Sequence, residues 1–241
     1  MFSTNAFSSE LDSSECKSKP IDKERSFTKN LEGVFNGKKL TYSASLKEKI
    51  LYEKDDPSAP LASFFYSEYI VENNENRPIM FVFNGGPGSA SLWLHMGVLG
   101  PKVVKVPSDA SDDGSAPYKI VDNKLSPLSD TDMVFIDPVG TGYSRAAGCH
   151  EGSEFWGVNE DPKIIAEFIR RWITDSKRWN SPKYILGESY GGIRGPLLVS
   201  ELRSGDITPI EINGLLMVAP ASDYHCLLYT SDAADEGLGV D

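Results

Sequence analysis

The serine at position 189 stands in a setting that fits a catalytic nucleophile. The motif GESYG occupies residues 187–191 and directly follows an apolar run at 184–186. In a G-x-S-x-G motif of this kind, a sharp turn from strand to helix exposes the serine hydroxyl, and small flanking residues let the turn close. We therefore predict that Ser189 is a nucleophile for acyl transfer and that the backbone N–H of Tyr190 helps to stabilise the oxyanion.

A glycine-rich loop with the sequence NGGPG, at residues 84–88, follows a second apolar run at 79–83. Because glycines let a bare backbone N–H approach a substrate oxygen, this loop is predicted to supply the other donor of the oxyanion hole. It lacks the Gly-Lys-Ser/Thr of a phosphate loop, and Ser91 replaces the third glycine of a dinucleotide fingerprint. A plain strand-to-helix turn is the remaining alternative for this loop.

Four short apolar runs, each followed by a Gly- or Pro-containing loop, predict the strands that position these residues. They lie at 79–83, 133–136, 184–186 and 215–218. Runs of this length are typical of strands buried on both faces of a parallel sheet. The functional loops of such an α/β sheet lie at the carboxyl ends of its strands, which is where both glycine-containing motifs fall.

One crossover helix is predicted between the second and third runs, with Asp161 as its N-cap and Pro162 at its first helical position. Glu167, Arg170 and Arg171 are expected on its solvent-facing side. The apolar residues that recur at helical spacing are Ile164, Ile165, Phe168, Ile169, Trp172 and Ile173.

The N-terminal part of the chain has a different character. Residues 1–27 are rich in Ser, Lys and Glu, which predicts a disordered or loosely attached tail. From 31 to 71 the pattern is strand-like, with a hairpin signal at Asn36-Gly37, so an antiparallel meander is expected. The chain is therefore predicted to form one α/β domain at residues 28–225, with flanking helices and this meander at its start.

Composition narrows the range of partners. The 241-residue chain is 40% hydrophobic and carries a formal net charge of −11, which argues against nucleic acid and against an anionic membrane surface as partners. Its three cysteines, Cys16, Cys149 and Cys226, form no C-x-x-C pair and are too scattered for a disulfide framework. We therefore expect neither a metal nor a cofactor.

Targeting signals are not visible in the sequence. No apolar run approaches the roughly 20 residues needed to cross a bilayer. The first residues lack both a basic n-region and an apolar h-region, so no signal peptide is predicted. The low cysteine count fits the cytoplasm, and the sequence leaves the compartment and the oligomeric state open.

Three motifs together resemble the serine carboxypeptidases, a family with the α/β-hydrolase fold. In chain order they are NGGPGSAS at 84–91, DPVGTGYS at 137–144 and GESYGG at 187–192, and the resemblance extends over roughly residues 30–225. Pro196, seven residues after the serine, also resembles the family pattern, and we expect it to kink the helix that follows.

The resemblance implies a role for each motif residue. Ser189 would be acylated, and the backbone N–H groups of Gly86 and Tyr190 would bind the oxyanion. Asn84 and Glu188 would hold the free C-terminal carboxylate of a peptide. Because two carboxylates in contact repel, Glu188 would have to share or carry a proton, which accounts for the acid preference that the family implies.

The sequence departs from the family pattern after the glycine-rich loop. Many relatives carry a glutamate pair about a dozen residues beyond it, one of which hydrogen-bonds the glutamate of the elbow. Here residues 94–99 read LHMGVL, with His95 and no acid. Carboxylate recognition and the acid optimum therefore stay open, and His95 is expected to be structural. In addition, Ser89 stands where many eukaryotic members have a disulfide cysteine.

The acid and base of the triad are expected to be missing from these residues. In the α/β-hydrolase order they follow the nucleophile, yet the only later histidine is His225, with Asp206 or Asp223 as the available acid. The family places both groups further downstream. Residues 226–241 resemble a translated sequencing-library adapter, so we predict a non-native tail there and a domain truncated after the strand that follows the elbow.

The function expected from the sequence is that of a serine-type carboxypeptidase fragment, acting on peptide or protein C-termini and inactive as this chain alone. A serine carboxypeptidase-like acyltransferase or esterase would use the same serine. A non-catalytic binding scaffold is a third possibility, although the elbow and the oxyanion residues are all present.

Overall fold

The computed structural model describes residues 23–72, 76–107, 109, 111, 116–204 and 208–222. Residues 1–22 of the predicted tail and the whole of the predicted non-native tail at 226–241 lie outside these ranges, as do Asp206, Asp223 and His225. Within the range predicted as a tail, Glu24 and Arg25 bond to Ile50 and Glu48 of the second strand, and the first strand begins at Ser26.

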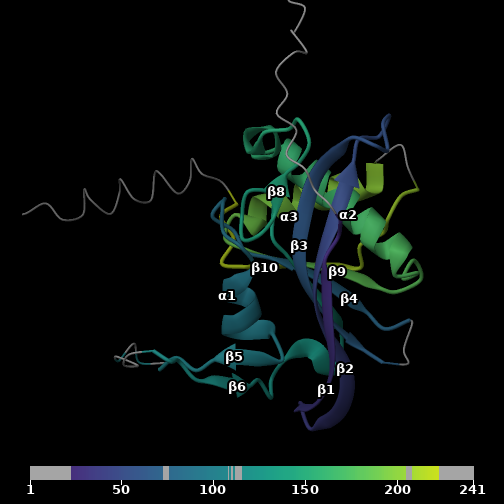
Figure 1. The fold of residues 1–241 in the computed structure, drawn as a ribbon. Helices are drawn as coiled ribbons and strands as arrows, with labels where there is room; N and C mark the ends of the chain where they lie inside the picture. The colour runs from purple at the N-terminus through teal and green to yellow at the C-terminus, as the bar shows by residue number, and fades with distance from the viewer. Residues whose placement is uncertain are drawn as a thin grey trace, which may run out of the picture.

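An eight-stranded mixed sheet forms the centre of the fold, in the order β1-β2-β3-β7-β4-β9-β10, with β8 also pairing with β3 (Figure 1). Its first part is the predicted antiparallel meander. The strands of that part are β1 (Ser26–Phe35), β2 (Lys38–Tyr52), β3 (Pro60–Val71) and β8 (Arg145–Ala146). Asn36 and Gly37 both have positive φ, 47° and 80°, so the predicted hairpin turn between β1 and β2 is confirmed.

The second part of the sheet is parallel and confirms the four predicted strands. They are β4 (Ile79–Phe83), β7 (Asp132–Ile136), β9 (Lys183–Glu188) and β10 (Gly214–Val218). Strand β7 pairs antiparallel with β3 and parallel with β4, which joins the two parts. The sheet therefore belongs to the α/β class that the sequence predicts.

Side chains of the central strands alternate between two hydrophobic cores. Phe81 and Ile136 point into one core, which α2 (Glu160–Asp175) and α3 (Gly191–Ser204) cover. Met80 and Phe135 point into the other, to which Leu94 of α1 (Leu92–Leu94) contributes. Strands covered on both faces must be apolar throughout, which explains their uninterrupted hydrophobic runs.

The connections between these strands are short elements. They are the π-helix η2 (His95–Leu99), the strands β5 (Lys102–Val104) and β6 (Ile120–Asp122), and the 3-10 helices η3 (Pro127–Ser129) and η4 (Gly152–Phe155). Strands β5 and β6 form a separate two-stranded sheet, which projects away from the main sheet beside α1 in Figure 1. None of the described helices is long and apolar enough to cross a membrane.

The crossover helix α2 differs from its prediction in two respects. It begins at Glu160 after Asn159, so Asp161 is its second residue and does not cap it. Arg170 is buried instead of solvated, because its guanidinium donates to the backbone carbonyls of Glu201, Leu202 and Thr208. A long cationic side chain can be buried when carbonyl acceptors at a neighbouring helix end satisfy it.

Strand β10 is more exposed than a strand buried on both faces. Leu216, Met217 and Val218 are each 43–47% exposed. It is the last strand in the sheet order and pairs only with β9 among the described residues. The run of apolar residues correctly indicated a strand, but the burial of its faces depends on neighbours that a local pattern does not report.

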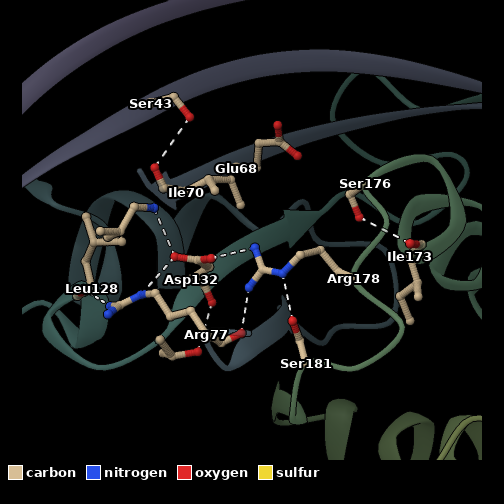
Figure 2. A network of polar contacts seen from close by, with 12 residues as sticks. Ser43, Glu68, Ile70, Arg77, Leu128, Asp132, Ile173, Ser176, Arg178 and Ser181 are labelled. Atoms are coloured by element: carbon tan, nitrogen blue, oxygen red, sulfur yellow. Dashed lines mark hydrogen bonds and ion pairs between the residues drawn. The ribbon is translucent and has the colours of Figure 1, made fainter. Parts of the chain in front are cut away.

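A buried ionic network fixes the amino ends of the parallel strands (Figure 2). Asp132 is fully buried and forms ion pairs with Arg77 at 3.0 Å and Arg178 at 2.8 Å. The same carboxylate accepts the backbone N–H of Val71, and Arg178 donates to Ser181. The network therefore joins β3, the entry to β4, β7 and the loop before β9, at the sheet edge opposite the elbow.

Cys149 is disulfide-bonded, which a sequence with few and scattered cysteines did not predict. One such bond is still far from the disulfide framework of a small secreted domain.

Candidate active site

Ser189 lies at the turn between β9 and α3, in the backbone conformation of a nucleophile elbow. Its φ is +56°, in the left-handed region that a non-glycine residue rarely adopts. The Ser189 N–H donates to the carbonyl of Val218 at 2.9 Å, and its carbonyl accepts the N–H groups of Gly192 and Ala221, each at 2.8 Å. These bonds hold the strained turn. Helix α3 then continues to Ser204 with Pro196 inside it.

The glycine-rich loop packs directly against this elbow. A Cβ at Gly85 would lie 2.5 Å from both the Glu188 carbonyl oxygen and the Tyr190 backbone nitrogen, and 2.9 Å from the Ser189 Cβ. Only glycine allows backbone to approach backbone this closely. The next residue, Gly86, is exposed and has a φ of +112°. The structure thus brings together the two peptide segments that carry the expected oxyanion donors, Gly86 and Tyr190.

Asn84 is almost fully buried, and its side chain is held from both ends. Its Oδ1 accepts the backbone N–H of Leu94 at 3.0 Å, which directs the Nδ2 group toward the elbow. There Nδ2 donates to Glu188 Oε2 at 3.1 Å. The two side chains expected to bind a substrate carboxylate are therefore in contact with each other. Residues 94–99, which contain no glutamate, contact the Oδ1 of Asn84 through the backbone N–H of Leu94.

The third motif, DPVGTGYS, frames the glycine-rich loop. Asp137 Oδ1 accepts the backbone N–H of Ser91 at 2.8 Å, and the Ser91 hydroxyl donates to the carbonyl of Ile136. Ser144, the last residue of the motif, connects the motif to β3. Its hydroxyl donates to the Asp137 carbonyl at 2.6 Å and accepts the N–H of Phe65 at 2.8 Å. Burial raises the pKa of the Asp137 carboxyl.

A cavity of about 300 Å³ opens beside the elbow, between the ring of Tyr190 and the loops of the first and third motifs. Its walls are largely apolar, with Pro87, Pro138 and Trp156 among them. Its polar lining includes Asp161 and Arg194, which form an ion pair at 2.6 Å. Burial raises the pKa of Asp161, and the nearby Arg194 opposes that shift.

Arg194 and Asp161 belong to the site, although the sequence did not assign them to it. Arg194 is only 2% exposed, three residues into the helix that the elbow begins. A cation between small residues, in the stretch GGIRGP at 191–196, is the one sequence signal that points to it. Its partner Asp161 lies 33 positions earlier, so no local pattern connects the two.

The two described histidines bond to groups other than Ser189. His95 Nε2 is bonded to the Tyr69 hydroxyl at 2.6 Å, and its ring stacks on Phe135. Burial lowers the pKa of His95 to about 4, so the imidazole is neutral at neutral pH. His150 pairs with Glu53 and Glu154 near the surface. No described residue makes a hydrogen bond to the Ser189 hydroxyl, and no group of three metal-ligating side chains is found in the described ranges.

Sequence comparisons agree with this geometry. The family model described as serine carboxypeptidase matches residues 50–230. Serine carboxypeptidase-like 2 of Arabidopsis thaliana is 30% identical over 169 residues, which cover 67% of this chain and 36% of that protein. Serine carboxypeptidase-like 4 of the same plant is 30% identical over 173 residues, covering 68% and 37%. The chain thus spans little more than a third of the length of these relatives.

A solved structure supports the fold. The prohormone-processing carboxypeptidase KEX1(Δ)P from Saccharomyces cerevisiae superposes with a TM-score of 0.59, covering 84% of this chain and 43% of the yeast one. At 24% identity this likeness concerns the fold. Together with the family match over residues 50–230, the elbow at Ser189 and the loop at Asn84 identify the chain as a member of the serine carboxypeptidase family.

Proposed function

We propose that the full-length protein containing these residues is a serine-type carboxypeptidase that hydrolyses the C-terminal peptide bond of its substrates. The observation that carries this proposal is the contact between Asn84 and Glu188 next to Ser189. An amide donor and a carboxyl group at that place would bind the free carboxylate of a peptide. They would thereby set the last peptide bond over the nucleophile.

In this mechanism the Ser189 Oγ attacks the scissile carbonyl carbon, and the resulting oxyanion accepts the backbone N–H groups of Gly86 and Tyr190. Collapse of the tetrahedral intermediate releases the C-terminal amino acid and leaves the acyl group on Ser189. Water then hydrolyses the acyl-enzyme. A base must take the serine proton and return it to the leaving amine.

We expect no carboxypeptidase activity from the 241-residue chain alone. The two described histidines are engaged with Tyr69 and with Glu53 and Glu154, so neither serves as a base for Ser189. Rapid release of C-terminal amino acids by this chain, dependent on Ser189, would contradict that expectation.

The direct test uses the full-length protein and an N-blocked dipeptide. We expect release of the C-terminal amino acid, loss of that release in Ser189→Ala, and weak activity on the same dipeptide with an amidated C-terminus. Equal activity on the free and the amidated dipeptide would overturn the carboxypeptidase assignment, because it would show that the carboxylate is not recognised.

A serine carboxypeptidase-like acyltransferase or esterase is the second candidate. The segment after the glycine-rich loop, residues 94–99, contains no acid that could pair with Glu188, and the backbone N–H of Leu94 donates to Asn84. Among the described residues, the proposed recognition of a carboxylate uses Asn84 and Glu188. Offering the full-length protein an activated ester with and without an acceptor alcohol separates the two candidates. A non-catalytic scaffold would fail to react with a fluorophosphonate, which labels active serines.

A further inference from the structure

Arg194 is a buried cation at the base of the elbow, and its contacts point to a specific role. Its side chain is 2% exposed, and it lies in the first turn of α3, five residues after Ser189. Nε donates to Asp161 Oδ2 at 2.6 Å, and Nη1 donates to the backbone carbonyl of Asn84 at 2.8 Å. One planar guanidinium therefore connects the start of α2 with the first residue of the glycine-rich loop.

Two aromatic rings hold the same guanidinium. Its Cζ lies 5.1 Å from the centre of the Phe83 ring and 5.2 Å from the centre of the Tyr190 ring. Both distances lie within the range of a cation–π contact, which is stronger when the cation is desolvated. Phe83 immediately precedes the glycine-rich loop, whereas Tyr190 immediately follows the nucleophile.

These contacts bridge the two halves of the expected oxyanion hole. One donor, Gly86, lies two residues after the carbonyl that Arg194 binds, and the other donor is the N–H of Tyr190 itself. The Asn84 side chain is already fixed by Leu94 and Glu188. The bond from Arg194 to the Asn84 carbonyl holds the backbone of that residue as well, which connects the loop to the helix that follows the elbow.

Stability alone does not account for a charge at this place. Burying an ion pair carries a large desolvation cost, and apolar residues of similar volume often serve stability as well or better. Arg194 and Asp161 also line the cavity beside the elbow, next to the position where a substrate would bind.

We propose that Arg194 is a positioning residue of the oxyanion hole. It sets the separation of the Gly86 and Tyr190 donors through the Asn84 carbonyl and the Tyr190 ring, and Asp161 orients its guanidinium. This inference rests on the proposed role of Ser189 as an acylated nucleophile. Arg194 acts through Asn84 and Tyr190 and does not itself contact the substrate in this proposal.

The test measures the rate constant for phosphonylation of Ser189 by a fluorophosphonate in the full-length protein. In that reaction the Ser189 hydroxyl gives its proton to the base of the full-length protein, its Oγ forms a bond to phosphorus and the P–F bond breaks to release fluoride, while the phosphoryl oxygen occupies the oxyanion hole. We expect Arg194→Met to slow this reaction and the kcat for the blocked dipeptide on the order of 100-fold, with KM changed much less. Displacements of about 1 Å and the loss of one oxyanion donor have effects of that size.

A double variant separates positioning from stability. Arg194→Met alone leaves Asp161 without its cation, which destabilises the fold, whereas Asp161→Asn combined with Arg194→Met removes both charges. We expect the double variant to regain thermal stability but to remain slow in phosphonylation. Arg194→Lys, which can reach only one of the two acceptors, should recover part of the rate.

The phosphonylation rate of the double variant decides whether Arg194 positions the oxyanion donors or only stabilises the fold. If the double variant is stable and reacts at the wild-type rate, Arg194 acts only on folding and the proposal is wrong. If the wild type reacts with the probe but releases no amino acid from the dipeptide, the carboxypeptidase assignment fails, and the variants still decide the role of Arg194. A wild type that does not react with the probe overturns both proposals.

Discussion

The amide of Asn84 donates to the carboxyl of Glu188 at 3.1 Å, which joins the end of β4 to the end of β9 across the site. Neither residue is a neighbour of the other in sequence, since they are 104 positions apart. The parallel register pairs Phe83 with Gly187, so the next residue on each side, Asn84 or Glu188, lies at the same edge of the sheet. A binding site for a carboxylate can form there because the sheet topology brings both side chains to that edge.

Replacing Asn84 with Ala should weaken the binding of substrates that end in a free carboxylate. The lost hydrogen bond to the substrate carboxylate corresponds to a KM increase of roughly tenfold, equivalent to about 1.4 kcal/mol. An ester substrate without a C-terminal carboxylate is the matched control, and its KM should change much less. Equal losses on both substrates would show that Asn84 supports the loop and not the carboxylate.

Glu188→Gln should strengthen the binding of substrates that end in a free carboxylate. A glutamine keeps the shape of the glutamate side chain and does not repel the substrate carboxylate. We expect the full-length variant to have a lower KM than the wild type for the blocked dipeptide at neutral pH, and an unchanged KM for the same dipeptide with an amidated C-terminus. An unchanged KM for the free dipeptide would show that Glu188 does not face the substrate carboxylate.

Gly85→Ala should disable the site, because the added Cβ would meet backbone atoms of Glu188 and Tyr190 at 2.5 Å and neither can move aside cheaply. Overpacking of this kind costs about 1–3 kcal/mol or more. We expect a lower melting temperature and strongly reduced fluorophosphonate labelling of Ser189. Gly97→Ala is the matched control, since a Cβ there has nothing within 4 Å. Wild-type labelling of Gly85→Ala would show that the loop and the elbow are not in close contact.

His95 should make the protein less stable in acid. Burial lowers its pKa from about 6.5 to about 4, so the folded state holds the neutral imidazole while the unfolded chain binds a proton. Its contribution is complete above pH 6.5 and is lost as the pH falls toward 4, which amounts to at most about 3 kcal/mol. Urea unfolding at pH 7 and pH 4 should show a smaller acid loss in His95→Gln than in the wild type. Equal losses would place the acid sensitivity elsewhere.

The sequence predicted those features that depend on neighbours in the chain. Short stretches of residues are enough to indicate the hairpin at Asn36-Gly37 and the four apolar strands. The three motifs are likewise short and could be recognised in their order along the chain. The elbow was predictable for the same reason, because the glycines that surround Ser189 are what its backbone conformation requires.

The features that the sequence did not predict depend on partners far away in the chain. Arg170 was expected in solvent because its helical position is polar, but carbonyls near α3 satisfy it. Asp161 was expected to cap α2, whereas its carboxyl pairs with Arg194 of the next helix. The exposure of β10 likewise depends on which strand lies next to it in the sheet. A single sequence carries no local signal for such pairings.

The network around Asp132 allows stability to be changed without touching the site. Asp132→Asn would leave Arg77 and Arg178 buried beside a neutral partner, which should cost about 3–5 kcal/mol of unfolding free energy. Asp130→Asn removes an exposed carboxylate that pairs with Lys38 and should change stability by less than about 0.5 kcal/mol. Below the melting temperature of Asp132→Asn, the labelling rate of Ser189 should equal that of the wild type, because Asp132 begins β7 whereas the site lies at the opposite ends of the strands. A slower rate at full folding would mean that the two ends of the sheet are coupled.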